Sequence, residues 1–268
     1  MTEISHGSPN RFPAGTFAPA PAPASLPAMI AAQTRMELTL LLRNGEQLLL
    51  TMFIPITLMI GLSLLPIDTG SGDTTAARAT TFVPAILAVA IMSTAFTGQA
   101  IAVGFDRRYG ALKRLGATPI PRWGIIAGKS CAVILVVILQ SVILGAIGAA
   151  LGWRPSIGGL LLGAVIVALG TIAFAVLGLL LGGTMKAEVV LALGNLIWFV
   201  LLGLGSLIVF DEHVPSLVHW AARCSPSGAL TEALTRALDS SVDLFGIGVL
   251  AAWAVVGGAL AVRWFRFQ

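Results

Sequence analysis

The sequence predicts an all-α polytopic membrane protein. Of its 268 residues, 57% are hydrophobic and only 10% are charged, whereas soluble globular chains average about 45–50% apolar and about 25% charged residues. The 30 glycines match the enrichment of small residues in packed membrane helices. A water-soluble globular fold is therefore excluded. The net charge of +4 is attributed to Lys and Arg retained in cytoplasmic loops and not to nucleic acid binding.

The N-terminal segment 1–28 is predicted to be a disordered, Pro/Ala-rich cytoplasmic tail. Six of the 14 prolines lie in residues 1–27, and such a composition extends the chain and cannot bury a core. From Met29 to Gln47, the side chains of Met36, Leu40 and Leu41 share one helical face while charged residues occupy the others. This pattern predicts an amphipathic helix at the membrane surface.

Residues 29–268 are predicted to form one domain of six transmembrane helices, because a span needs about 20 apolar residues. The six candidates, none of which contains Asp, Glu, Lys, Arg or His, are Leu48–Leu65, Thr81–Phe105, Ser130–Leu151, Ile157–Leu181, Val189–Phe210 and Leu244–Val262. Two longer connections remain, a loop over residues 106–129 and an outer segment over residues 211–243.

The distribution of basic residues predicts the orientation. Placing the N-terminus inside puts 12 of the 16 Lys and Arg residues on the cytoplasmic side and leaves only Arg78, Arg154, Arg223 and Arg236 outside. Because Lys and Arg near span ends are retained in the cytoplasm, we expect both termini to be cytoplasmic in a multi-pass protein of the cell membrane.

Several kinds of chemistry are not expected of this chain. The stretch Gly124–Ser130 is similar to a phosphate-binding loop, but its first glycine is displaced by one residue and no strand precedes it. The three histidines lie outside the spans, so neither a metal site nor haem is predicted. One outer cluster, Asp211, Glu212 and His213, leaves open a membrane enzyme acting on lipid-linked substrates.

Charge-free spans argue against transport driven by ions, which relies on ionisable residues inside the membrane. The spans do contain polar residues, including Gln140 in the third. Two interpretations stay open: hydrogen bonding between helices, or a substrate path lined by Thr97, Gln99 and Asn195.

The loop at residues 106–129 carries six of the 12 inner basic residues. Tyr109, Leu112 and Leu115 are spaced three apart, which predicts a short helix with an apolar stripe that ends at Gly116 and Pro119. Attraction to anionic lipid and docking into a groove on a cytoplasmic partner are both consistent with this pattern.

The stretch Phe105-Asp-Arg-Arg-Tyr-Gly-Ala-Leu-Lys-Arg-Leu-Gly-Ala-Thr-Pro119, with Arg122-Trp123 and Gly128-Lys129 after it, resembles the loop of the type-two ABC exporter permeases. Asp106 replaces the usual Glu, and Ala111 replaces the usual Thr. The Pro-containing segment from Cys224 to Arg236 is similar to the outer segment of the same family.

The resemblance implies a permease that acts with a separate cytoplasmic ABC ATPase in two copies and a second permease, identical or paralogous. ATP and Mg would be bound by the ATPase, and no cofactor by this chain. The loop would be the coupling helix, with Leu112 and Leu115 seated in a groove of the ATPase. Its implied coupling residues are Asp106, Arg107, Arg108, Tyr109, Gly110, Leu112, Lys113, Arg114 and Leu115.

Short outer loops and small size resemble the antibiotic-efflux branch of the family. Aromatic residues make up only 7% of the chain, which leaves little material for a sugar-stacking channel. We therefore expect a lipophilic small molecule as the substrate, moved outward through the membrane lipids. Export of a polysaccharide or a lipid is the alternative.

Overall fold

The computed structural model describes residues 24–45, 49–66, 74–210 and 215–265, and within these ranges the chain is helical and contains no strand. The elements are α1 (Leu26–Arg43), the π-helical segment η1 (Leu49–Phe53), α3 (Ile54–Leu64), α4 (Thr75–Ile91), the π-helical segment η2 (Met92–Gly98), α5 (Gln99–Arg108), α6 (Ala111–Leu115), α7 (Arg122–Ala150), α8 (Ile157–Thr184), α9 (Ala187–Val209), α10 (Ser216–Cys224), α11 (Pro226–Leu238) and α12 (Leu244–Trp264).

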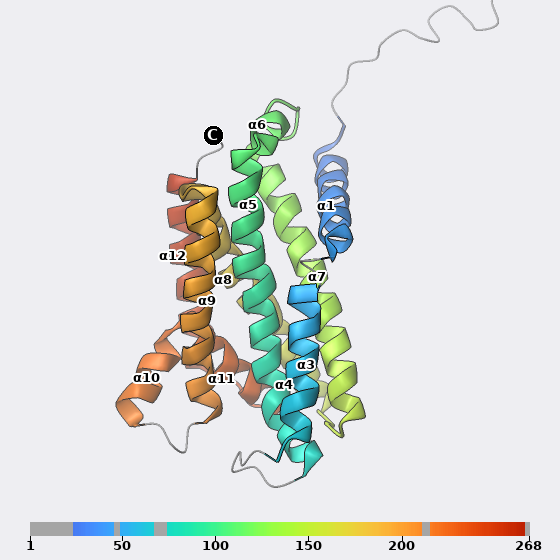
Figure 1. Cartoon of the computed structure of the whole chain (residues 1–268), viewed down its shortest axis with the longest axis vertical. Helices are drawn as coiled ribbons and strands as arrows, with labels where there is room; N and C mark the ends of the chain where they lie inside the picture. Colours follow the sequence, from blue (N-terminus) through green and yellow to red (C-terminus); the bar gives the residue numbers. More distant parts are fainter. Residues whose placement is uncertain (1–23, 46–48, 67–73, 211–214, 266–268) are drawn as a thin grey trace, which may run out of the picture.

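The long helices run side by side along the long axis of the molecule (Figure 1). Helix α6 lies at one end, here called the α6 end, and α10 and α11 lie at the opposite end, here called the α11 end. Helix α4, η2 and α5 form one continuous rod, Thr75–Arg108, which is the most buried of the apolar helices. The core therefore lies along this rod.

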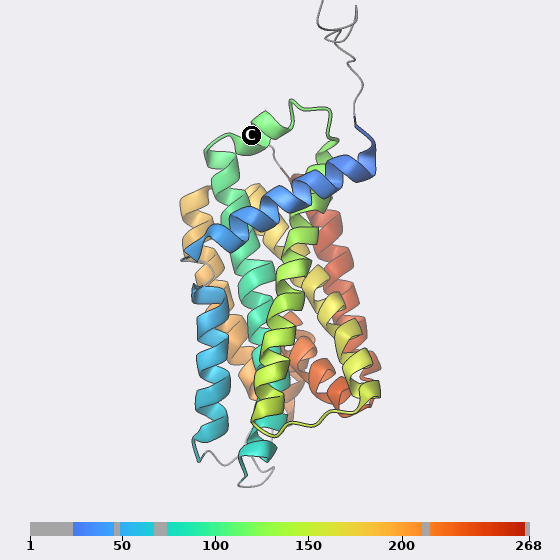
Figure 2. The same ribbon diagram turned by 90° about the vertical axis from the view of Figure 1, so that its right-hand side faces the viewer.

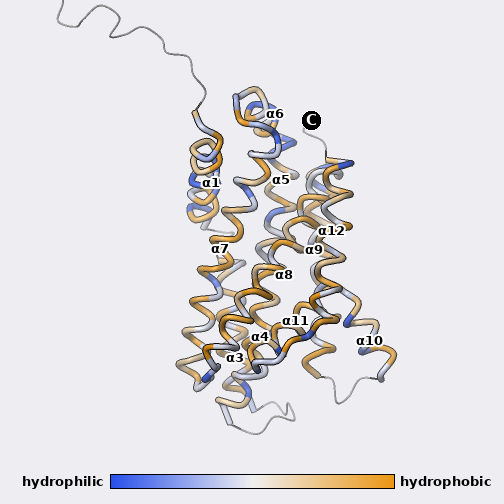
Figure 3. Tube along the Cα trace, turned by 180° about the vertical axis from the view of Figure 1, so that it is seen from behind, coloured by the Kyte–Doolittle hydropathy of each residue, from blue (hydrophilic) through white to orange (hydrophobic). Residues whose placement is uncertain are grey.

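Five helices of the described residues are long and apolar enough to cross a membrane. They are Thr75–Arg108, Arg122–Ala150, Ile157–Thr184, Ala187–Val209 and Leu244–Trp264. Each contains most of a predicted span, and Figure 3 shows the apolar residues along them. The remaining predicted span, 48–65, is a shorter apolar helix, Thr51–Leu64, and Leu48 lies outside the described residues. The count of six spans and the side of the termini stay predictions.

Several helices extend beyond the predicted spans, and the extensions carry charge. Helix α7 begins at Arg122, directly after Pro121, and not at Ser130. A hydropathy pattern stops at the first charged residue, whereas the helix itself continues back to the proline. Helix α7 thus contains Lys129, and α4 contains Arg78, both of them buried.

Helix α1 (Leu26–Arg43) overlaps the segment Met29–Gln47 for which a surface helix was predicted, and it begins within the predicted tail; Gln47 lies outside the described residues. Figure 2 shows α1 crossing the bundle diagonally near the α6 end. Its polar residues Gln33 and Glu37 are buried against the bundle, whereas Met36 and Leu40 are exposed. This arrangement leaves the apolar side of α1 free for lipid, so that its position at the membrane surface stays a prediction.

The outer segment is more ordered than a connecting loop. Residues 211–214, which include Asp211, Glu212 and His213, lie outside the described residues. The segment after them forms α10 and α11, and α11 enters the bundle with Ala229, Leu230 and Leu234 fully buried.

Glycines on α8 bring its backbone against the central rod. A Cβ added at Gly178 would lie 2.7 Å from the carbonyl oxygen of Phe96, and one at Gly182 would lie 2.4 Å from that of Ala100. Real Cβ atoms do not approach so closely, so only glycine fits. Gly178 and Gly182 therefore serve helix packing, as expected from small residues at membrane helix interfaces.

Replacing Gly182 with Ala should destabilise the protein, because the clash is with backbone and cannot be relieved by a side-chain rotation. We expect a loss of about 1–3 kcal/mol, as for overpacked cores. Thermal unfolding in detergent, followed by tryptophan fluorescence, measures it. The matched control is Gly203→Ala on α9, where an added Cβ meets nothing within 4 Å. Equal unfolding temperatures for the two variants would contradict the packing described here.

Candidate functional site

The predicted coupling loop forms a compact cap at the α6 end. Helix α5 ends at Arg108, and Gly110 adopts a left-handed conformation (φ 70°) that favours glycine at the turn into α6. Helix α6 then ends at Leu115, before Gly116. The expected short helix is therefore present, but Tyr109 lies in the turn before it.

Leu112 has a different place from the one that the resemblance implied. Its side chain is 1% exposed and packs in a cluster with Val103, Ile125 and Leu179. In this conformation Leu112 anchors α6 to α5, α7 and α8 and is not available to a partner. Leu115 packs against the same cluster while remaining partly exposed.

Two arginines of the predicted set bind other parts of the same chain. Arg107 Nη1 donates to the carbonyl oxygens of Gly182 (3.0 Å) and Met185 (2.9 Å), at the C-terminus of α8. A positively charged donor at a helix C-terminus forms hydrogen bonds with the last carbonyl oxygens, and its charge interacts favourably with the helix dipole. Arg108 forms an ion pair with Glu188 in the first turn of α9. These contacts tie the loop to α8 and α9.

Three further residues of the predicted set face outward. Tyr109 is 66% exposed, and Lys113 and Arg114 are exposed as well. Trp123, at the start of α7, is also exposed. Together these four residues, here called the docking surface, present positive charge and aromatic rings at the α6 end.

Asp106 belongs to a buried ion cluster that sequence reasoning missed. Lys129 Nζ of α7 lies 2.8 Å from the carboxylate of Glu37 on α1 and 2.5 Å from Asp106 Oδ2 on α5. Gln33 Nε2 donates to Glu37 Oε1 at 2.7 Å. The Lys129 side chain is only 7% exposed. One ammonium group therefore joins three helices that are distant in sequence.

Gly128 explains why α1 lies close enough to reach Lys129. A Cβ at Gly128 would lie 2.4 Å from Gln33 Cγ. The neighbouring Gly-Lys pair was the available sequence signal, but nothing in the sequence identified Glu37 as the partner.

A second network joins the two π-helical segments. Gln140 of α7, which is 1% exposed, donates to the carbonyl oxygen of Thr51 in η1 and to Thr94 Oγ1 in η2, both at 2.8 Å. For Gln140, this contact is the expected hydrogen bonding between helices. π-Helical turns in long helices are frequent at functional sites.

Two of the three residues predicted to line a substrate path lie on the same groove. Thr97 of η2 and Asn195 of α9 line a groove of about 670 Å³ between α3, the central rod and α9. Apolar side chains such as Ile54, Phe105 and Phe199 form most of its lining. Thr97 Oγ1 has no hydrogen-bond partner among the described residues.

Gln99 does not line this groove. It is 3% exposed, and its amide atoms have no partner within the described part of the chain.

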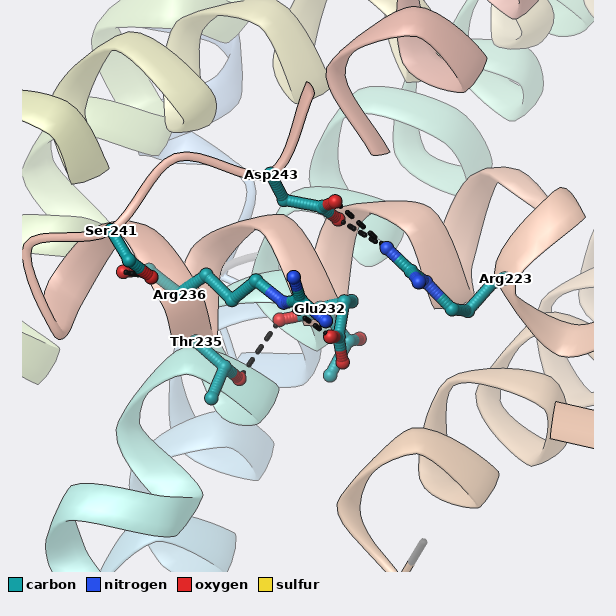
Figure 4. Close-up of polar contacts among 7 residues, drawn as sticks. Arg223, Glu232, Thr235, Arg236, Ser241 and Asp243 are labelled. Atoms are coloured by element: carbon teal, nitrogen blue, oxygen red, sulfur yellow. Dashed lines mark hydrogen bonds and ion pairs between the residues drawn. The ribbon is translucent and has the colours of Figure 1, made fainter. Parts of the chain in front are cut away.

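At the α11 end, Arg223 of α10 forms an ion pair with Asp243 (Figure 4). Its Nη2 donates to both carboxylate oxygens, at 2.7 and 2.9 Å, and its guanidinium lies about 5 Å from the ring centres of Trp220 and Phe245. This pair fixes α10 to the start of α12.

The structure thus combines apolar helices of membrane-spanning length with a positively charged, aromatic surface at one end. A sequence model of the ABC-2 type transporter family matches residues 30–238. Because the match covers well over half of the chain, the protein belongs to this family. It is a multi-pass integral membrane protein and an ABC transporter permease. The comparison with curated proteins gave no match.

Replacing Lys129 with Met should leave the carboxylates of Glu37 and Asp106 buried without their cation. We expect the free energy of unfolding to fall by about 3 kcal/mol, because uncompensated buried charge is strongly destabilising. Chemical unfolding in detergent measures the loss. The control combines Lys129→Met with Glu37→Gln and Asp106→Asn, and should regain most of it. If the neutral combination is no more stable than the single variant, the ion cluster does not hold these helices together.

Proposed function

We propose that this chain is the permease subunit of an ATP-driven exporter whose ATP hydrolysis is supplied by a separate cytoplasmic ABC ATPase. The observation that carries the proposal is the docking surface, which is exposed, cationic and placed between the ends of α5 and α7. In this proposal ATP and Mg are bound by the ATPase, and the permease contributes the path through the cell membrane. Two ATPases and a second permease, identical or paralogous, would complete the transporter.

The contacts of the loop support a coupling role. Leu112 anchors α6 in the bundle, and Arg107 and Arg108 tie the loop to α8 and α9. Through Asp106, the loop is also joined to Lys129 and so to α1. A displacement of the docking surface by a partner would therefore be transmitted to several helices together.

We propose a lipophilic small molecule, such as an antibiotic, as the substrate. The groove beside Thr97 and Asn195 has a mostly apolar lining surface interrupted by several polar side chains, a mixture that is usual for small-molecule sites. Exposed Phe199 and Val200 lie on the same helix as Asn195. A second permease facing this side would enclose the groove. Export of a polysaccharide or a lipid is the alternative substrate class.

Reversing the charge of the docking surface, with Lys113→Glu and Arg114→Glu together, should abolish binding of the ATPase and export. Membrane insertion should be unchanged, because both side chains are exposed. Pull-down of the tagged chain from its own membranes, followed by assay of bound ATPase, provides the measurement.

The control for this experiment reverses two charges on α1, with Arg35→Glu and Arg43→Glu, which are exposed and outside the docking surface. This variant should retain the ATPase. Unchanged ATPase recovery with the Lys113 and Arg114 variant would remove the docking surface from the coupling role.

Removing two of the polar groups of the groove, with Thr97→Val and Asn195→Leu together, should reduce export of a lipophilic dye about fivefold, the value of one hydrogen bond of about 1 kcal/mol. Dye accumulation in cells measures it, at equal amounts of protein in the membrane. Ser141→Ala, whose hydroxyl only donates to the Val137 carbonyl, is the control. Unchanged dye accumulation with an altered surface glycan would favour polysaccharide export.

A further inference from the structure

A second groove, distinct from the proposed substrate path, opens between α7 and α8 near the α11 end. Its volume is about 990 Å³. Leu87 of the central rod and Leu234 and Leu238 of α11 form its floor. The connector between α7 and α8 closes one end with Trp153 and Arg154. Residues on its rim, such as Val142, are exposed.

The polar side chains in the walls of this groove already have hydrogen-bond partners within the protein. Its two hydroxyl side chains, Ser141 and Thr171, each donate to a carbonyl of their own helix, Val137 at 2.8 Å and Val167 at 2.6 Å. All other wall residues on α7 and α8 are apolar. An occupant without hydrogen-bonding groups, such as a hydrocarbon chain, therefore matches the walls.

The end of the groove has the opposite character. Arg154 Nη1 donates to the carbonyl oxygens of Ala149 and Trp153, which holds the exposed guanidinium at the C-terminus of α7. Its Nη2 and Nε have no partner among the described residues. A guanidinium with free donors is suited to bind a phosphate group.

The α8 wall of the groove is close in length to one leaflet of a bilayer, and the α7 wall is longer. On α8 the groove extends from Leu160 to Thr171 and on α7 from Ile134 to Ala149, which at 1.5 Å per residue are about 17 Å and about 22 Å. Half of a hydrocarbon core is about 15 Å thick. Because α7 and α8 are both of membrane-spanning length, we expect lipid to reach a groove that opens at their exposed faces.

We propose that this groove binds one acyl chain of an anionic phospholipid, with its phosphate on Arg154. The leaflet is the one at the α11 end, which is the outer leaflet in the orientation predicted from the basic residues. The site does not depend on which compound the protein exports.

The test uses the purified full-length protein in phosphatidylcholine vesicles with a trace of phosphatidylglycerol carrying a photoreactive diazirine on its acyl chain. Mass spectrometry locates the cross-links. We expect them to concentrate in residues 134–149 and 160–171. Cross-links spread evenly over these helices and α12 would overturn the proposal.

Filling the groove with Ala164→Phe or Ala168→Phe, both at exposed lining positions, should lower labelling there to the level seen on α12. The matched control is Ala252→Phe on α12, an exposed alanine that does not line this groove. Two independent fillings guard against misfolding, which gel filtration detects. Persistent labelling in both folded variants contradicts an acyl chain in the groove.

Arg154→Gln should reduce labelling by phosphatidylglycerol about tenfold, the value of a charge-assisted hydrogen bond, and Arg154→Lys should restore most of it. Equal labelling by a phosphatidylcholine probe would show that binding does not require an anionic headgroup and would overturn that part of the proposal. A disulfide between two copies that carry Val142→Cys would show instead that a second copy covers the groove.

Discussion

The buried ammonium of Lys129 is the interaction on which the α6 end depends. It holds a carboxylate from α1 and another from α5, and neither helix has a second buried ion pair at this end among the described residues. A buried cation with two anions carries a large desolvation cost, and it persists only where good geometry and further hydrogen bonds offset that cost. Gln33 supplies one such bond. The position of α1 relative to the bundle thus depends on charge, whereas the centre of the bundle depends on close backbone packing.

The two ends of the molecule are held in different ways. At the α6 end, charged side chains join helices through the loop, and positive charge remains exposed on the docking surface. At the α11 end, Arg223 and Asp243 neutralise each other in a buried pair beside aromatic rings, and α11 fills the interior. The surface of the α6 end is therefore suited to receive a charged partner, while the interior of the α11 end is filled by α11.

Sequence reasoning predicted the helical class, five of the spans by length and composition, and the short helix before Gly116. It succeeded there because hydropathy and helix-stop residues are local signals. The Lys129 cluster could not be predicted, since its partners are 23 and 92 residues away and nothing local marks them as neighbours. Leu112 was assigned to a partner's groove because an apolar stripe on a basic helix has the same pattern whether it faces inward or outward. Gln99 shows the same limit, because polarity within a span does not reveal which side of the helix lines a path.

The π-helical segment η2 affects how the central rod would respond to the loss of one residue. A π-turn contains one residue more than an α-turn, so losing a single residue between Met92 and Gly98 would let this segment wind as ordinary α-helix. Each residue in an α-helix accounts for about 100° of rotation. The wide turn, however, covers nearly the same angle with one residue more, so the residues after the deletion would keep their faces and Asp106 would still face α7. The same deletion in an α-helical part of the rod would turn the residues that follow by about 100°, so the π-helical segment is the part of the rod that can lose a residue without changing which faces meet its neighbours.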